Sequence, residues 1–144
     1  MGAESAEKPY ALDVVRVISL PAARVYSAFT DQLDHWFGTA GSLVITPEPG
    51  GLYHFVTEMD DQRHPHYGRF IELTPGQRVS MTWVTGDPGT LGAETVVTID
   101  IAEEQAGTRV RIQQSGFYDE ASRDGHADAW PMVLEHLANT LDKG

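Results

Sequence analysis

A stretch near the C-terminus, Asp128–Leu141, constrains the fold most, because its apolar side chains recur at steps of three and four residues. This spacing predicts one apolar stripe on an α-helix about 20 Å long, at roughly 1.5 Å per residue. Glu135, His136, Asn139 and Asp142 fall off the stripe and are predicted to face water. A single helix of this kind must bury its stripe, and the upstream chain offers only a sheet as a partner. The stripe comprises Trp130, Val133, Leu134, Leu137, Ala138 and Leu141.

The start of this helix has two interpretations. If Asp128 is the N-cap, Pro131 falls in the first turn, where its missing N–H does no harm. Asp119–Asp124 then forms a separate helical turn that ends at Gly125. The alternative is a longer helix that is kinked at Pro131.

The chain before this helix predicts about seven strands and two short helices. Pro21 opens the first short helix, and Asp31 is the candidate cap of a second that ends near Trp36 and Phe37, before Gly38. Short turns rich in Gly, Pro and Asp separate the strands, which indicates an antiparallel meander. The predicted strands are Ala11–Ser19, Ser42–Thr46, Leu52–Met59, Pro65–Leu73, Arg78–Thr85, Glu94–Ala102 and Thr108–Ser115.

Length and composition narrow the class of protein. The 144 residues suit one domain, 1–144, with an ordered core of about 11–142. The net charge of −11 argues against binding to nucleic acids or anionic membrane surfaces. The chain contains no cysteine, which excludes disulfides and thiol chemistry. No signal peptide or membrane-spanning run is recognisable, so we expect a cytoplasmic protein.

The alternation of apolar and polar residues along the strands predicts one apolar, aromatic sheet face and one solvent-exposed face. Val79, Met81 and Trp83 share a face, and Gln114 is a polar residue on the apolar face. We expect this face and the helix to enclose a cavity, although the same rings could simply fill a core. Arg69, if it points inward, would demand an anion; the alternative is a surface salt bridge. The predicted ligand-binding residues are Trp36, Tyr53, Phe55, Tyr67, Arg69, Met81, Trp83, Gln114, Phe117 and Trp130.

Several of these motifs carry a family resemblance that covers roughly Ala11–Leu141. The run from Arg16 to Pro21, the Trp36-Phe37-Gly38 motif and the Met81-Thr82-Trp83 strand resemble Hsp90-ATPase-activator-homologue-like proteins, of the START-like superfamily of lipid-transfer, pathogenesis-related and polyketide-cyclase domains. The remaining matches are Val25-Tyr26, Ala28, Asp31, Gly50-Gly51, Tyr53, Phe55, Gly68, Glu72, Gly107-Thr108-Arg109, Gly116-Phe117 and Trp130.

The resemblance implies an α+β helix-grip fold, also called START-like or Bet v1-like. In this fold, a curved antiparallel sheet of six to seven strands wraps a long C-terminal helix, and two short helices follow the first strand. It also implies a deep cavity between sheet and helix. Family members often carry His near the end of the last strand, where this chain has Gln114, which cannot shuttle a proton at neutral pH.

Metal and catalytic motifs are weak. His64 and His66 have a ligand-like spacing, with Glu58 or Asp60 as a third ligand, but we expect exposed turn histidines and no metal or cofactor. His35 could line the cavity mouth. His54, His126 and His136 are expected at the surface. No nucleophile elbow, phosphate loop or dinucleotide fingerprint is present.

Three functional hypotheses remain open at this stage. The first is binding of a small hydrophobic or aromatic molecule. The second is a cyclase or dehydratase type of enzyme, with Tyr53, Tyr67 or His35 moving protons in a dry pocket. The third is a stress-related or chaperone-linked protein-interaction module. A homodimer is compatible with the sequence but is not indicated by it.

Overall fold

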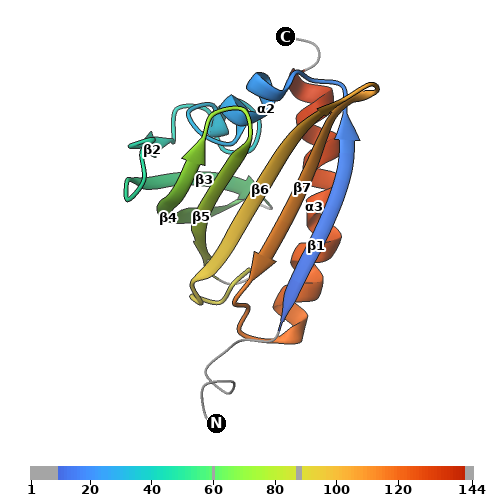
Figure 1. Cartoon of the computed structure of the whole chain (residues 1–144). Helices are drawn as coiled ribbons and strands as arrows, with labels where there is room; N and C mark the ends of the chain where they lie inside the picture. The colour runs from blue at the N-terminus through green and yellow to red at the C-terminus, as the bar shows by residue number, and fades with distance from the viewer. Residues whose placement is uncertain (1–9, 60, 87–88, 142–144) are drawn as a thin grey trace.

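The structure, a computed structural model, describes residues 10–59, 61–86 and 89–141. Within these ranges seven strands form one antiparallel sheet, in the order β1-β7-β6-β5-β4-β3-β2, and a long helix packs against it (Figure 1). The predicted α+β helix-grip architecture is confirmed. The elements are β1 (Ala11–Ile18), α2 (Ala22–Ala28), the 3-10 turn η1 (Leu33–His35), β2 (Val44–Ile45), β3 (Leu52–Met59), β4 (Gln62–Thr74), β5 (Arg78–Thr85), β6 (Thr95–Glu104), β7 (Gly107–Ser115) and α3 (Glu120–Leu141).

The sheet is a meander whose first strand closes onto its last. β1 pairs antiparallel with β7 along its whole length, from Ala11 opposite Ser115 to Ile18 opposite Thr108. α3 follows β7 in the chain and lies behind β1 and β7 in Figure 1, on the concave side of the sheet. The opposite end of the sheet, formed by β4, β3 and β2, is separated from β1 and β7 by β6 and β5 (Figure 1).

The apolar stripe of α3 is buried as predicted. Trp130, Leu134, Leu137 and Leu141 are 0 to 8% exposed, and Val133 and Ala138 pack partly buried beside them. Glu135, His136 and Asn139 are exposed, whereas Asp142 lies outside the described residues. Arg24 of α2 donates a hydrogen bond to the carbonyl of Leu141 at 3.1 Å, and so caps the last turn of the helix.

The predicted start of the helix at Asp128 is wrong, and the longer helix is correct. α3 begins at Glu120 and runs through both Gly125 and Pro131. Its cap is Asp119, whose Oδ1 accepts a hydrogen bond from the backbone N–H of Ser122 at 2.8 Å. Pro131 leaves one intrahelical bond unmade, and burial of the stripe on both sides outweighs that loss.

The segment after α2 is less helical than predicted. The expected second helix is a single 3-10 turn, and exposed Asp31 does not cap it. Asp34, within the 3-10 turn, holds the loop that follows, because its Oδ2 accepts hydrogen bonds from the N–H groups of Gly41 and Leu43 at 2.9 and 3.4 Å. Gly38 then passes so close to Phe55 that an added Cβ would lie 2.7 Å from the Phe55 ring.

The register of β3 with β4 corrects the predicted inward residues. Directly opposite residues in an antiparallel pair share a face, and Tyr53 and Phe55 lie opposite Gly68 and His66. Because both aromatic rings are buried, His66 and Gly68 must point inward as well. Tyr67 therefore points outward, where it is 44% exposed and stacks on His54.

Arg69 is also on the outer face, so its predicted inward guanidinium is wrong and its side chain is exposed at the surface. β4 begins at Gln62, which places His64 and His66 within a strand and not in a turn. Asp60, the other predicted metal ligand of this region, lies outside the described residues.

Replacing Leu137 by Ala tests the contribution of the stripe. The side chain is fully buried, so we expect Leu137→Ala to lower the free energy of unfolding by about 2–5 kcal/mol. Asn139→Ala, an exposed position on the same helix, should change it by less than about 0.5 kcal/mol. Urea denaturation measures both values, and equal effects would contradict the placement of the helix.

Candidate ligand-binding groove

A groove of about 1090 Å³ lies between α3, from Ala121 to His136, and the strands β3, β4 and β5. The segment 36–39 and the β5–β6 connection complete its walls. Trp36, Trp83 and Trp130, which are all the tryptophans of the chain, line it. The exposed side chain of Met132, at 65%, stands at its rim, so the groove opens to solvent.

The floor of the groove is a cluster of aromatic rings. Phe37 lies 5.8 Å from Trp83 and 6.3 Å from Trp130 between ring centroids, and the two indoles are 5.6 Å apart. The His66 ring is 5.3 Å from Trp83 and 5.8 Å from Phe37. These tilted and edge-on pairs fall in the range in which aromatic rings attract one another. A flat apolar molecule would find the same kind of surface.

His66 is a neutral imidazole in this floor. Its ring stacks on Phe55 at 4.9 Å and 9°, and burial lowers the pKa of His66 to about 4. Its Nδ1 lies 3.1 Å from the carbonyl oxygen of His64, which can only accept, so Nδ1 carries the proton. Nε2 of the neutral ring is therefore left as a hydrogen-bond acceptor.

His126 repeats this arrangement on the opposite wall. Its ring packs 4.9 Å from Phe117, and burial lowers the pKa of His126 as well. The Nδ1 atom donates to the carbonyl oxygen of Ser122 at 2.9 Å, one helical turn earlier. Its Nε2 is again an acceptor, so the groove contains two uncharged imidazoles with the same tautomer.

A buried chain of hydrogen bonds holds Trp130 in place. The indole Nε1 of Trp130 donates to Gln114 Oε1 at 2.8 Å, and Gln114 Nε2 donates to Thr95 Oγ1 at 2.9 Å. Thr95 in turn donates to the carbonyl of Trp83 at 2.7 Å. Gln114 is only 1% exposed and has both ends of its amide paired, so it positions an indole of the groove and does not line the groove itself.

The structure separates the predicted ligand-binding residues into three groups. Trp36, Trp83 and Trp130 line the groove. A second group is buried in the core behind it: Tyr53, Phe55, Met81, Gln114 and Phe117. Tyr53 donates its hydroxyl hydrogen to the carbonyl of Thr82 at 2.7 Å, and burial raises the pKa of that hydroxyl. The third group, Tyr67 and Arg69, is on the outer face.

Sequence reasoning missed Phe37, His66 and His126. The signal for His66 was the alternation of side chains between the two sheet faces. Counting back in steps of two from Phe70, it places Gly68 and His66 on the same face as that buried ring. For His126 it was the step of four to Trp130 on one helix. His126 is half-buried and not a surface residue, whereas exposed His35, predicted at the cavity mouth, is not among the residues that line the groove.

The described part of the chain contains neither a cluster of metal-binding side chains nor a helix that could span a membrane. No cluster of three or more His, Cys, Asp or Glu side chains with metal-binding geometry occurs there. Among the described helices, none combines the length and the apolarity that a membrane span requires.

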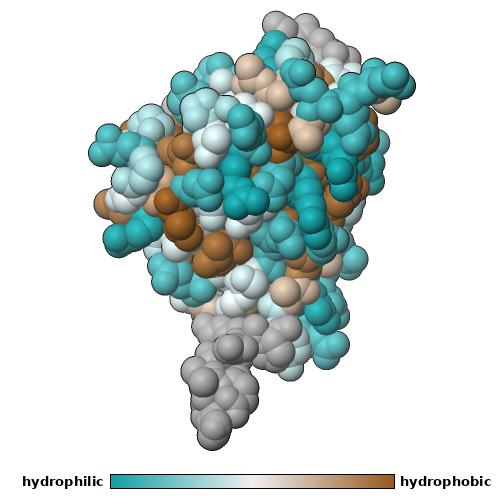
Figure 2. Space-filling view, in the orientation of Figure 1, coloured by the Kyte–Doolittle hydropathy of each residue, from teal (hydrophilic) through white to brown (hydrophobic). Residues whose placement is uncertain are grey.

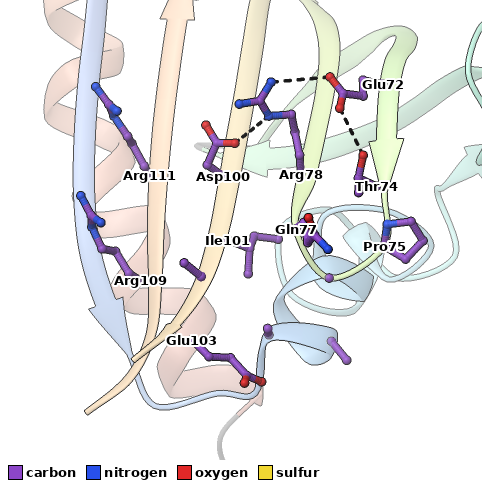
Figure 3. A pocket seen from close by; sticks show the side chains of 14 residues that line it. Glu72, Thr74, Pro75, Gln77, Arg78, Asp100, Ile101, Glu103, Arg109 and Arg111 are labelled. Carbon is purple, nitrogen blue, oxygen red and sulfur yellow. Dashed lines mark hydrogen bonds and ion pairs between the residues drawn. The ribbon is translucent and has the colours of Figure 1, made fainter. Parts of the chain in front are cut away.

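A second, polar cleft of about 990 Å³ lies on the outer face of the sheet (Figure 3). Four of its six charged side chains, those of Glu72, Arg78, Asp100 and Arg111, form ion pairs. Arg78 Nε lies 2.6 Å from Asp100 Oδ1, and Arg111 Nη2 lies 2.6 Å from Asp13 Oδ2. Glu72 approaches Arg78 from the other side in Figure 3, at 3.6 Å. Exposed pairs of this kind are well solvated and offer little to a ligand, so the aromatic groove is the better candidate site.

A curved antiparallel sheet closed by one long C-terminal helix, with an apolar groove between them, defines a helix-grip domain. The model of one family, described as activator of Hsp90 ATPase homolog 1-like protein, matches residues 19–142. The chain belongs to this family, as the resemblance of its motifs predicted.

Solved structures share this fold. Protein CV1439 from Chromobacterium violaceum is 29% identical with a TM-score of 0.72, over 91% of this chain and 96% of its own. Protein MLL2253 from Mesorhizobium loti is 24% identical with a TM-score of 0.75, over 92% and 97%. DynU16, from the dynemicin biosynthetic locus, is 19% identical with a TM-score of 0.74, over 92% and 47%. No curated protein matches the chain in sequence.

Replacing Gln114 by Leu tests the hydrogen-bond chain. The substitution leaves the buried indole N–H of Trp130 without an acceptor, so we expect a loss of about 1–3 kcal/mol in the free energy of unfolding. It should also shift the Trp130 indole resonance in ¹H–¹⁵N spectra. Gln113→Leu is the matched control, because the neighbouring Gln113 is exposed on the opposite face. A similar loss of stability in both variants would argue against this chain of hydrogen bonds.

The titration of His66 follows from its burial. Its pKa is about 4 in the folded protein and near 6.5 when unfolded. Between these pH values only the unfolded state binds the proton, so His66 lowers stability as the pH falls through this window and has no effect above it. His66→Phe should therefore lose less stability than the parent on acidification, by up to about 1.4 kcal/mol per pH unit.

Urea denaturation across this pH range and the NMR titration of the His66 ring protons measure the two effects. His54→Phe, at an exposed position on the neighbouring strand, is the control and should follow the parent. A His66 midpoint near 6.5 would show that the ring is solvated.

Proposed function

We propose that the protein binds a small, largely apolar molecule with an aromatic ring in the groove between α3 and the sheet. The observation that carries this proposal is a groove of about 1090 Å³ on which all three tryptophans of the chain converge. Ligand sites are concave and mainly apolar, with a few placed polar groups, and the two imidazoles are such groups here. DynU16, which shares the fold, comes from a biosynthetic locus, and this fits a role with small molecules.

The expected affinity is moderate. A ligand the size of an aromatic side chain buries roughly 150–250 Å². At about 25 cal/mol per Å² this corresponds to about 4–6 kcal/mol. Lost translational and rotational freedom offsets part of that gain, so we expect dissociation constants of about 0.1 mM or weaker for simple aromatic probes.

Enzymatic activity is the alternative that the groove itself favours next. The three residues predicted to move protons are not in the groove, since Tyr53 is paired in the core, Tyr67 is on the outer face and His35 is outside the lining. His66 and His126 are the groups that could act as general bases, because both are neutral and have Nε2 available. Turnover of a bound compound that stops in His66→Phe would favour this alternative over simple binding.

The protein-interaction hypothesis rests on the outer face. Val44, Leu52, Tyr67 and Ile71 of β2, β3 and β4 are 44 to 70% exposed, and Figure 2 shows hydrophobic side chains among hydrophilic ones on that face. Single exposed apolar residues are normal for soluble proteins. The aromatic groove is the stronger indication. Cytoplasmic location and a homodimer stay predictions from the sequence.

Filling the groove tests the proposal. Ala129 lines it from α3, so Ala129→Phe should abolish or weaken naphthalene binding by at least about tenfold while the protein stays folded. Ala23→Phe, at an exposed helical position outside the groove, is the matched control and should bind naphthalene like the parent. The tryptophan indole resonances in ¹H–¹⁵N spectra report binding. Equal affinity in all three proteins would place the ligand elsewhere.

A further inference from the structure

The polar groups of the groove accept hydrogen bonds more than they donate them. His66 and His126 have each committed Nδ1–H to a backbone carbonyl, which leaves Nε2 as an acceptor on both rings. The indole N–H groups of Trp36 and Trp130 are already bonded, to the Ala28 carbonyl and to Gln114. The threonine and serine hydroxyls of the lining donate and accept, so they do not discriminate between ligands.

Apart from its histidines, the ionisable side chains that line the groove are acidic. Glu58 and Asp119 belong to its lining, whereas no lysine or arginine does. Burial holds the pKa of His66 and of His126 down, so neither ring supplies a positive charge at neutral pH. The chain as a whole has a net charge of −11. His64 and His136 also line the groove, and Nε2 of His136 already donates to the carbonyl of Trp36 at 2.9 Å. An anionic headgroup entering the groove would lose its hydration and find no lysine or arginine to pair with.

We propose that the ligand is an uncharged aromatic molecule that carries a hydrogen-bond donor, such as a phenolic hydroxyl, and that the groove discriminates against carboxylates. The inference rests on the proposed function and narrows it to a chemical class. The ring packs against Phe37, Trp83 and Trp130, and the hydroxyl donates to Nε2 of His66 or His126. A fatty acid or an aromatic acid offers an anion where the groove provides acceptors.

Three probes with the same ring system separate the effects of the ring, the hydrogen-bond donor and the negative charge: naphthalene, 2-naphthol and 2-naphthoate. Titrations at neutral pH follow the three indole resonances of ¹⁵N-labelled protein, which all report on the groove. We expect 2-naphthol to bind about five- to tenfold more tightly than naphthalene, as one hydrogen bond to a neutral acceptor allows. We expect 2-naphthoate to bind at least about tenfold more weakly than 2-naphthol.

The variant His66→Phe with His126→Phe removes both acceptors and keeps the rings. It should bind naphthalene within about twofold of the parent but lose the preference for 2-naphthol. The ratio of the two affinities within one variant cancels any general change in the groove. His54→Phe, on the outer face, is the control and should keep the preference.

The outcomes separate the two proposals. Three results would each overturn the inference and leave the groove as a binding site. In the first, naphthalene binds as tightly as 2-naphthol; in the second, 2-naphthoate does. In the third, the preference for 2-naphthol survives in the double variant. If none of the three probes binds, the proposed function itself fails.

Discussion

Burial of one face of α3 against the sheet is the constraint on which the groove depends. Leu134, Leu137 and Leu141 fix the C-terminal half of the helix in the core. On the sheet, α3 contacts mainly β1, the strand paired with β7. The strands β3 and β4 lie toward the other end of the same sheet. The groove therefore lies where α3 faces β3, β4 and β5, away from its contact with β1. Trp130 stands at the boundary, buried and yet part of the groove wall.

The polar residues of this interior are satisfied without charge. Gln114 accepts from Trp130 and donates to Thr95, and among the described residues no buried side-chain polar atom lacks a partner. A side-chain amide donates and accepts a hydrogen bond at any pH. A histidine at the same position could do so only while neutral, and only as the tautomer that matches these two partners. Gln114 therefore makes the position of the Trp130 ring independent of pH, while His66 and His126 are ionisable groups of the groove lining.

The fold was predictable from the sequence because period and turn chemistry are local signals. The stripe from Trp130 to Leu141 and all seven strands were recognisable in this way. The site was less predictable, because it depends on which face of β4 turns inward, and that parity is set by pairing with β3. An aromatic residue, Tyr67, was assigned to the interior on its chemistry, although Gly68 is the residue that the close approach of Thr82 requires there. The helix start was missed for a related reason: burial of Trp130 outweighs the local signals of Gly125 and Pro131.

On α3, the residues that stabilise the fold and those that would contact a ligand form two adjacent stripes. The buried stripe steps from Trp130 through Leu134 and Leu137 to Leu141. A second stripe lines the groove and consists of Ser122, His126, Ala129, Val133 and His136, of which the last three each precede a buried residue by one position. Neighbouring positions on a helix are about 100° apart, so the second stripe can change without opening the core. A family built on this helix can therefore keep its fold while the groove-lining stripe sets which molecule binds. In this chain that stripe includes the imidazole of His126, whose pKa is lowered by burial.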